Sequence, residues 1–207
     1  DAAPFGKTYK SILFASLRQC VAAHKLVRNE EGDVLFLSKE HGSGGFIATV
    51  DVTYPSIPLF LKYNPELAKG MLRPILKFAR MPVWEYDFAP HDVGMYPVCC
   101  GQLYGLRNDE SKYHGKIDEC GVYEYSLQTR FPLWLLPKGF NAYNFEQQMP
   151  VEESANMLIV ALGVCRAEKS ARFFSENADL FDKWVGYLTK YGLYPENQLC
   201  TDDFAGH

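Results

Sequence analysis

Helical periodicity dominates both ends of this sequence and is weak in its middle. Between Thr8 and Val27, apolar side chains recur three or four residues apart, and no Gly or Pro interrupts them. Similar periodicity runs from 151 to 169 and from 176 to 191, where Gly192 follows. Helices in succession, without regular alternation of strands and helices, predict a mainly α-helical fold rather than a parallel α/β sheet.

Shorter elements are predicted between these helices. Asn64 is a favourable N-cap and Pro65 suits the first position of a helix, so a helix is expected over 65–80. A short helix is expected over 56–62. Two short extended runs, 34–37 and 46–52, flank a Gly-rich turn and are typical of a hairpin.

The middle of the chain, residues 81–148, is rich in Pro, Gly, Tyr and Trp. It predicts long loops with short strands, for example over 121–129. We expect strands to be confined to 33–53 and 98–148. Long loops within a compact domain are often functional.

Composition limits the classes of protein that the chain can represent. Its 207 residues, 47% of them hydrophobic, suffice for one well-filled core, so 1–207 is interpreted as a single domain. The 21 basic and 25 acidic residues are spread along the chain. They form no basic stripe, so a nucleic-acid partner is not expected. No apolar run reaches the length of a bilayer span, which predicts no membrane partner. The six cysteines form no C-x-x-C pair, and most are expected to be buried thiols.

Four segments place polar, Gly and aromatic residues densely at expected helix starts or in loops. Such positions on a rigid scaffold often carry binding and catalytic groups. The segments are Ser38–Glu40 with Thr49–Pro55, His91–Pro97, Pro150–Met157 and Glu196–His207.

In these segments the chain resembles the glutaminase A family, whose central region carries the same motifs in the same order. The motifs are Thr-Val-Asp-Val-Thr-Tyr-Pro, His-Asp-Val-Gly, Pro-Val-Glu-Glu and Asn-Gln-Leu-Cys-Thr-Asp-Asp-Phe-Ala-Gly-His. The resemblance implies a six-hairpin (α/α)6 toroid with short β-strands and long loops. It also implies L-glutamine deamidation, attached to some members, and a secreted or periplasmic location.

The resemblance also implies that the chain is a fragment of a larger toroid, because the family continues beyond the position of His207. Residues 106–147 have no counterpart in the family pattern and are interpreted as a loop and strand insertion. Helix faces that would meet the missing hairpins should expose apolar surface. We therefore expect contacts with the remaining domains of the parent chain and self-association.

Carboxylates are the natural groups for hydrolysis in such toroids, one protonated toward the leaving group and one ionised to activate water. We assign the general acid to Glu153, the base to Asp202, and a substrate-anchoring role to Asp92. His91, Tyr54, Asn156 and Asp203 are predicted to line the same cavity and bind substrate.

Each assignment has a structural alternative. Glu152 and Glu153 suit the first turn of a helix, where the helix dipole favours negative charge. Asp202 and Asp203 suit a cap of a following helix. His91 and Asp92 suit an ordinary loop, with His91 stacked on Tyr96 or Trp84.

A metal site combining His91, Asp92, Asp202 and His207 lacks the close spacing typical of ligand motifs, so no metal and no cofactor is expected.

Covalent catalysis is a further alternative, because amide hydrolysis often uses Ser, Thr or Cys. Ser38 with Lys39, or Cys200 and Thr201 with His207, would supply the groups, but a hydroxyl in a turn and a buried thiol explain them better. The glycines around Ser43 lack the Lys of a phosphate-binding loop.

The sequence thus predicts a hydrolase domain acting on L-glutamine or, by analogy with toroidal glycosidases, on a carbohydrate. The alternative is a non-catalytic module that binds a glycan or a partner domain through Trp84, Tyr86, Tyr96 and Tyr104. Converging carboxylates in unlike surroundings would favour catalysis, whereas an open aromatic shelf would favour binding.

Overall fold

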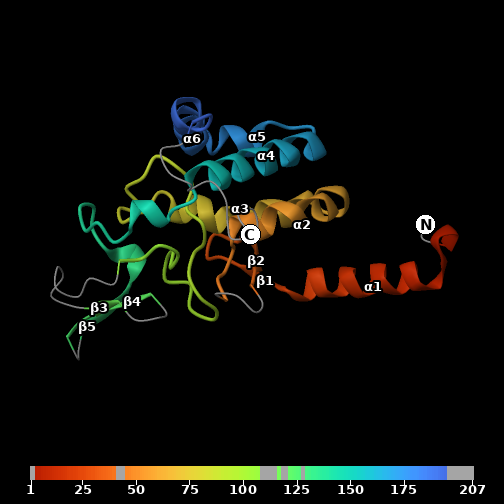
Figure 1. The fold of residues 1–207 in the computed structure, drawn as a ribbon, viewed down its shortest axis with the longest axis horizontal. Coiled ribbons are helices and arrows are strands. Elements are labelled where there is room, and N and C mark those ends of the chain that lie inside the picture. The colour runs from red at the N-terminus through yellow and green to blue at the C-terminus, as the bar shows by residue number, and fades with distance from the viewer. Residues whose placement is uncertain (1–2, 41–44, 108–115, 118–120, 127–128, 195–207) are drawn as a thin grey trace.

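The body of the molecule is a stack of helices (Figure 1), seen in a computed structural model that describes residues 3–40, 45–107, 116–117, 121–126 and 129–194. Helix α2 (Val50–Tyr63) is followed directly by α3 (Pro65–Phe78), and α4 (Pro150–Glu168) packs against both. The short α5 (Arg172–Ser175) and α6 (Ala178–Tyr191) cover α4 on its other side. The predicted mainly α-helical fold is confirmed, and this stack agrees with part of an α-toroid.

Helix α3 begins where the sequence predicts. The side chain of Asn64 accepts a hydrogen bond from the backbone N–H of Glu66 at 3.2 Å, and Pro65 occupies the first turn, where no helical partner for an N–H is needed. The buried face of α3 includes Met71, Leu72 and Ile75, and its period gives this helix its place in the core.

A two-stranded antiparallel sheet packs against α3. Strands β1 (His24–Arg28) and β2 (Val34–Ser38) pair with Leu26 opposite Phe36. Gly70 makes the close approach of α3 to β2 possible, because a Cβ at that position would lie 3.0 Å from the backbone nitrogen of Phe36. The sheet therefore serves as a cover on one side of the helical stack.

The core is built mostly from helix faces, with aromatic rings at its centre. Phe181 and Trp184 of α6 are fully buried, and Met157 and Ala161 of α4 meet them from the neighbouring layer. Trp84 is also buried in this core, and its indole N–H is satisfied there by the carbonyl of Phe88 at 2.9 Å.

The middle of the chain forms the end of the molecule opposite α1 (Figure 1). It holds a three-stranded antiparallel sheet in the order β3-β4-β5, and two 3₁₀ turns follow. These elements are β3 (Lys116–Ile117), β4 (Val122–Ser126), β5 (Thr129–Pro132), η2 (Leu133–Leu135) and η3 (Phe145–Gln147).

Helix α1 (Gly6–Ala22), preceded by the 3₁₀ turn η1 (Ala3–Phe5), extends away from the body (Figure 1). None of its residues is buried, and Ile12, Phe14 and Leu17 expose 60%, 53% and 43% of their surface. Among the described residues, most of its apolar side chains lie on the surface, and Cys20 near its end packs against the core.

Several sequence predictions differ from the structure. The hairpin expected from 34–37 and 46–52 is wrong, because β2 pairs with β1 and meets the second run only through the isolated bridge between Lys39 and Ile47, as far as the described residues show. Strand β1 also lies outside 33–53 and 98–148, the ranges expected to hold the strands.

The helix expected over 8–27 ends at Ala22, because residues from His24 onward pair with β2 and the His24 ring stacks on Phe36 at 4.4 Å. The extended run expected over 46–52 is wrong from Val50 onward, where α2 already begins and buries its first turns against α4. Helix α2 consequently contains the short helix expected over 56–62 and is longer than predicted.

Candidate functional site

Two carboxylate side chains and one imidazole, from distant parts of the sequence, meet in the interior. Asp51 lies in the first turn of α2, His91 in the loop after α3, and Glu153 in the first turn of α4. One ligand-type atom from each lies within 4.8 Å of the other two. His91 and Glu153 are buried, and Asp51 is half-buried. We refer to Asp51, His91 and Glu153 as the central cluster.

Backbone hydrogen bonds place the first turn of α2 next to the His91 loop. The N–H of Val50 donates to the carbonyl of His91 at 2.9 Å. Just before it, Ile47 donates to Gly94 at 2.7 Å and accepts from Val93 at 3.0 Å. These bonds hold Asp51 beside the imidazole.

A second set of bonds joins the His91 loop to α4. The hydroxyl of Ser154, the residue after Glu153, accepts from the N–H of Ala89 at 3.0 Å, and both groups are buried. Gln102 accepts from the N–H of His91 at 2.6 Å and donates to the side chain of Gln148, just before α4, at 2.7 Å. The position of Glu153 relative to His91 is thus fixed by buried hydrogen bonds.

The imidazole of His91 is hydrogen-bonded through one nitrogen and faces Asp51 with the other. Nδ1 lies 3.0 Å from Oδ2 of Asp92, and Nε2 lies 3.7 Å from Oδ1 of Asp51. Its ring stacks on Tyr104 with centroids 4.3 Å apart, and the edge of Phe46 meets it at 5.8 Å. The expected stacking on Tyr96 or Trp84 is therefore wrong, since the partner comes from the loop that also supports Asp92.

Asp92 is fully buried, and its carboxylate is surrounded by donors. Oδ1 accepts from the N–H of Gly94 at 2.8 Å and of Leu103 at 3.0 Å, and Oδ2 accepts from Tyr104 at 3.2 Å. Gly94 has φ +118°, and a Cβ there would approach the nitrogen of Cys100 to 2.8 Å, so this turn requires glycine. These contacts suit a residue that positions His91, whereas the substrate-anchoring role of Asp92 stays a prediction.

Charge opposes burial at His91. Burial lowers the pKa of the imidazole, but the hydrogen bond with Asp92 and the negative charges of Asp92, Asp51 and Glu40 raise it, and together they raise the pKa above its usual value. The imidazole is therefore biased toward its protonated form within the cluster.

The other predicted site residues lie at different distances from this centre. Asn156, one turn after Glu153 on α4, is buried, while Tyr54, one turn after Asp51 on α2, is 38% exposed. Asp202 and Asp203 lie outside the described residues, so their roles stay predictions. Cys200, Thr201 and His207 lie there as well.

Asp51 was not selected from the sequence, although its motif was. A signal was present: Asp51, like Glu153, stands in a polar motif in the first turn of a helix. Because residues 46–52 were interpreted as extended, the helix start that positions Asp51 was missed.

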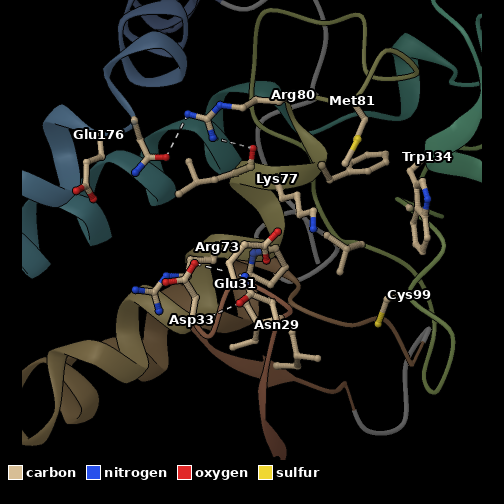
Figure 2. A pocket seen from close by; sticks show the side chains of 18 of the residues that line it. Asn29, Glu31, Asp33, Arg73, Lys77, Arg80, Met81, Cys99, Trp134 and Glu176 are labelled. Carbon is tan, nitrogen blue, oxygen red and sulfur yellow. Dashed lines mark hydrogen bonds between the residues drawn. The ribbon is translucent and has the colours of Figure 1, made fainter.

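A separate cavity of about 800 Å³ lies on another side of α3, between the β1–β2 hairpin and α5 (Figure 2). No residue of the central cluster lines it. Two of its cations already have partners: Arg73 pairs with Glu66 at 2.7 Å, and Arg80 pairs with Asp179 at 2.6 Å. We place the candidate site at the central cluster, because buried charged groups converge there.

The aromatic residues considered for an open binding shelf do not act as one surface. Trp84 is buried in the core, Tyr86 stacks on Phe88 at 4.8 Å, and Tyr104 stacks on His91. Tyr96 remains 45% exposed, with the ammonium of Lys39 over its ring at 4.6 Å. Their packing weakens the interpretation as a binding module.

The mainly helical fold, with helices stacked in successive layers, fits the class of α-toroid domains. Comparison with known proteins identifies the group. The chain matches the glutaminase A six helical-hairpin domain over residues 6–207, and it belongs to that family.

Two curated relatives agree with this assignment. The chain is 33% identical over 207 residues to "Glutaminase A" of Aspergillus oryzae, an alignment that covers 100% of this chain and 24% of the relative. It is 28% identical over 222 residues to "Probable glutaminase/05536" of Arthroderma benhamiae, covering 96% of this chain and 25% of the relative. The chain thus spans about a quarter of the length of these relatives. No solved structure matches it.

Within the described part of the chain, no helix combines the length and the apolar character needed to cross a bilayer.

Proposed function

We propose that this domain contributes the reacting groups of a glutaminase-type amidohydrolase, and that hydrolysis takes place at the central cluster. One observation carries the proposal: two carboxylates and one imidazole, from segments some 40 to 60 residues apart, converge within 4.8 Å of one another. Groups of this kind are buried together at a cost in free energy, which active sites commonly bear. The names of the two relatives supply the substrate class.

Hydrolysis of the amide needs three catalytic contributions from the protein. Water must be activated to attack the side-chain carbonyl of L-glutamine, the developing oxyanion must be stabilised, and the departing nitrogen must receive a proton to leave as ammonia. Glu153 and Asp202 remain the proposed carboxylates for proton transfer, and Asp51 joins them. His91 faces the cluster through Nε2 and offers positive charge, because Asp92 holds its other nitrogen.

Spacing disfavours inverting glycoside hydrolysis at this pair of acids. Inverting glycosidases separate their carboxyl groups by about 6.5 to 9.5 Å to admit water on the far face of the sugar. Asp51 and Glu153 offer oxygens within 4.8 Å of each other. As a pair they are therefore too close for that mechanism.

The remaining features of the proposal rest on the family. We propose that the parent protein is secreted, that its other domains contact this one, and that a small polar substrate reaches the cluster. Asn156 and Tyr54, which flank the cluster on α4 and α2, are retained as substrate-binding candidates together with Asp203.

The test is ammonia release from L-glutamine by the protein that contains this domain, with L-asparagine and nitrophenyl glycosides assayed in parallel. Glu153→Gln and Asp51→Asn should each lower kcat by about 10²- to 10⁴-fold, the usual contribution of a general acid or base. The matched control is Glu152→Gln, the same change at the adjacent, half-buried position outside the cluster. It should alter kcat less than about threefold.

Circular dichroism and melting temperature establish whether each variant folds. If folded Glu153→Gln and Asp51→Asn proteins both retain near-normal turnover, the cluster is not the reaction site. If the glycosides are hydrolysed and the amides are not, the substrate class is wrong while the site remains.

A further inference from the structure

We propose that the central cluster binds one divalent transition-metal ion of the zinc type, with Asp51, His91 and Glu153 as its three protein ligands. Their ligand atoms lie within 4.8 Å of one another, and Nε2 of His91 is 3.7 Å from Oδ1 of Asp51. Zinc bonds of about 2.0 to 2.2 Å in tetrahedral geometry separate the donors by about 3.3 to 3.6 Å. Small side-chain rotations therefore bring this set to bonding distance.

The donor types select the class of ion. An imidazole nitrogen favours zinc and related transition ions, whereas calcium and magnesium prefer oxygen donors throughout. Three protein ligands leave a fourth position for water, which is the arrangement of catalytic rather than structural zinc. Counted with Asp92, the site gathers three carboxyl groups around one imidazole.

The surroundings of His91 provide an independent indication. A histidine that binds a metal through one nitrogen nearly always donates its other N–H to a carboxylate, carbonyl or water, which fixes the tautomer and the ring orientation. Here Nδ1 of His91 lies 3.0 Å from the fully buried carboxylate of Asp92, while Nε2 lies 3.7 Å from Oδ1 of Asp51. Asp92 is itself fixed by three backbone N–H groups, those of Gly94, Leu103 and Tyr104.

The ion deepens the proposed function at one point. It would polarise the amide carbonyl and lower the pKa of its bound water, which are the usual services of zinc in hydrolysis. Glu153 would then be a ligand rather than a proton donor, His91 would be a neutral ligand with the ion supplying the positive charge in its place, and proton transfer would fall to Asp202. The inference concerns binding and stands whether or not glutamine is the substrate.

The experiment is a calorimetric titration of the chelator-treated chain with Zn²⁺, repeated with Mn²⁺, which binds thiols weakly, and with Ca²⁺. We expect one equivalent of Zn²⁺ per chain and weaker binding of Ca²⁺. Glu153→Gln should weaken Zn²⁺ binding at least 100-fold. Asp92→Asn should weaken it about 10- to 100-fold without losing a ligand, the effect typical of a group that orients a ligating histidine.

Two control variants address adventitious binding. Glu152→Gln makes the same change beside a proposed ligand, and Cys99→Ser removes a half-buried thiol that could bind Zn²⁺. Both should bind Zn²⁺ within about twofold of the original chain. Because a cluster variant can fail to fold, the melting temperature of the unaltered chain is also measured, and it should rise with Zn²⁺ concentration.

Absence of saturable Zn²⁺ binding to the unaltered, folded chain would overturn the inference. So would binding that survives in folded Glu153→Gln and is lost in Cys99→Ser. Ammonia release from L-glutamine by a protein that shows no Zn²⁺ binding would leave the proposed function intact and overturn this inference, whereas stoichiometric binding without any amidase activity would do the reverse.

Discussion

The substitution Asp92→Asn tests whether the buried carboxylate holds the site together. In the folded protein Oδ1 accepts from Gly94 and Leu103, and an asparagine oxygen can keep both of these bonds. Oδ2 accepts from Tyr104 and faces Nδ1 of His91, so an NH₂ group at that position would oppose the Tyr104 N–H and also the N–H of an imidazole that is protonated at Nδ1. Hydrogen bonds to a charged group contribute about 1.5 to 3 kcal/mol each, so two lost bonds predict a cost of about 3 to 6 kcal/mol.

Urea unfolding followed by far-UV circular dichroism measures this loss of stability. The control is Asp87→Asn, the same chemical change at an exposed residue that pairs with Lys183 at 3.2 Å. It should cost less than about 1 kcal/mol, as exposed ion pairs usually do. If Asp92→Asn also costs less than about 1 kcal/mol, the carboxylate does not anchor the loop and the reasoning fails.

The pKa of His91 supplies a second readout of the same substitution. Since the folded state raises this pKa, the folded protein binds the proton more tightly, and the resulting stabilisation is fully present below the unfolded value of about 6.5. It is lost as pH rises through the higher folded pKa. The unaltered chain should therefore lose stability as pH increases above about 6.5, and Asp92→Asn should show a smaller decline.

Two further predictions concern packing. Gly70→Ala should destabilise the fold by about 1 to 3 kcal/mol, because the new methyl group would press on the β2 backbone. Gly186→Ala on α6, with no atom within 4 Å of its Cβ, should instead stabilise the fold by up to about 1 kcal/mol. Equal effects of the two substitutions on the free energy of urea unfolding would contradict this explanation. The exposed apolar side chains of α1 should cause self-association that rises with protein concentration and falls when Phe14 and Leu17 are replaced by Ser. Light scattering that shows a strict monomer at high concentration would refute this prediction.

Local signals in the sequence determined most helices. The cap at Asn64, the proline that follows it and the apolar period of α3 all act within a few residues, so they can be recognised without knowing the fold. The same is true of α4 and α6. The family motifs also placed Glu153 and His91 among the candidate site residues before any distance was known.

Other features were decided only by contacts between distant segments. The sequence from 24 to 28 continues a helical pattern, yet it forms a strand because β2 offers it a partner. Val50–Val52 alternates like a strand, yet it starts α2 because α4 receives its buried face. In both cases long-range pairing and burial outweigh a weak local preference.

The candidate site divides in the same way. The sequence determined which residues can transfer protons or bind a cation, because that depends on side-chain chemistry alone. It did not distinguish Asp51, which faces the cluster, from Asp92, which is turned toward three backbone N–H groups and one imidazole. Only the tertiary structure separates them, because the role of a carboxylate is set by the donors around it, and two of the donors to Asp92, the N–H groups of Leu103 and Tyr104, come from a loop about ten residues further along the chain.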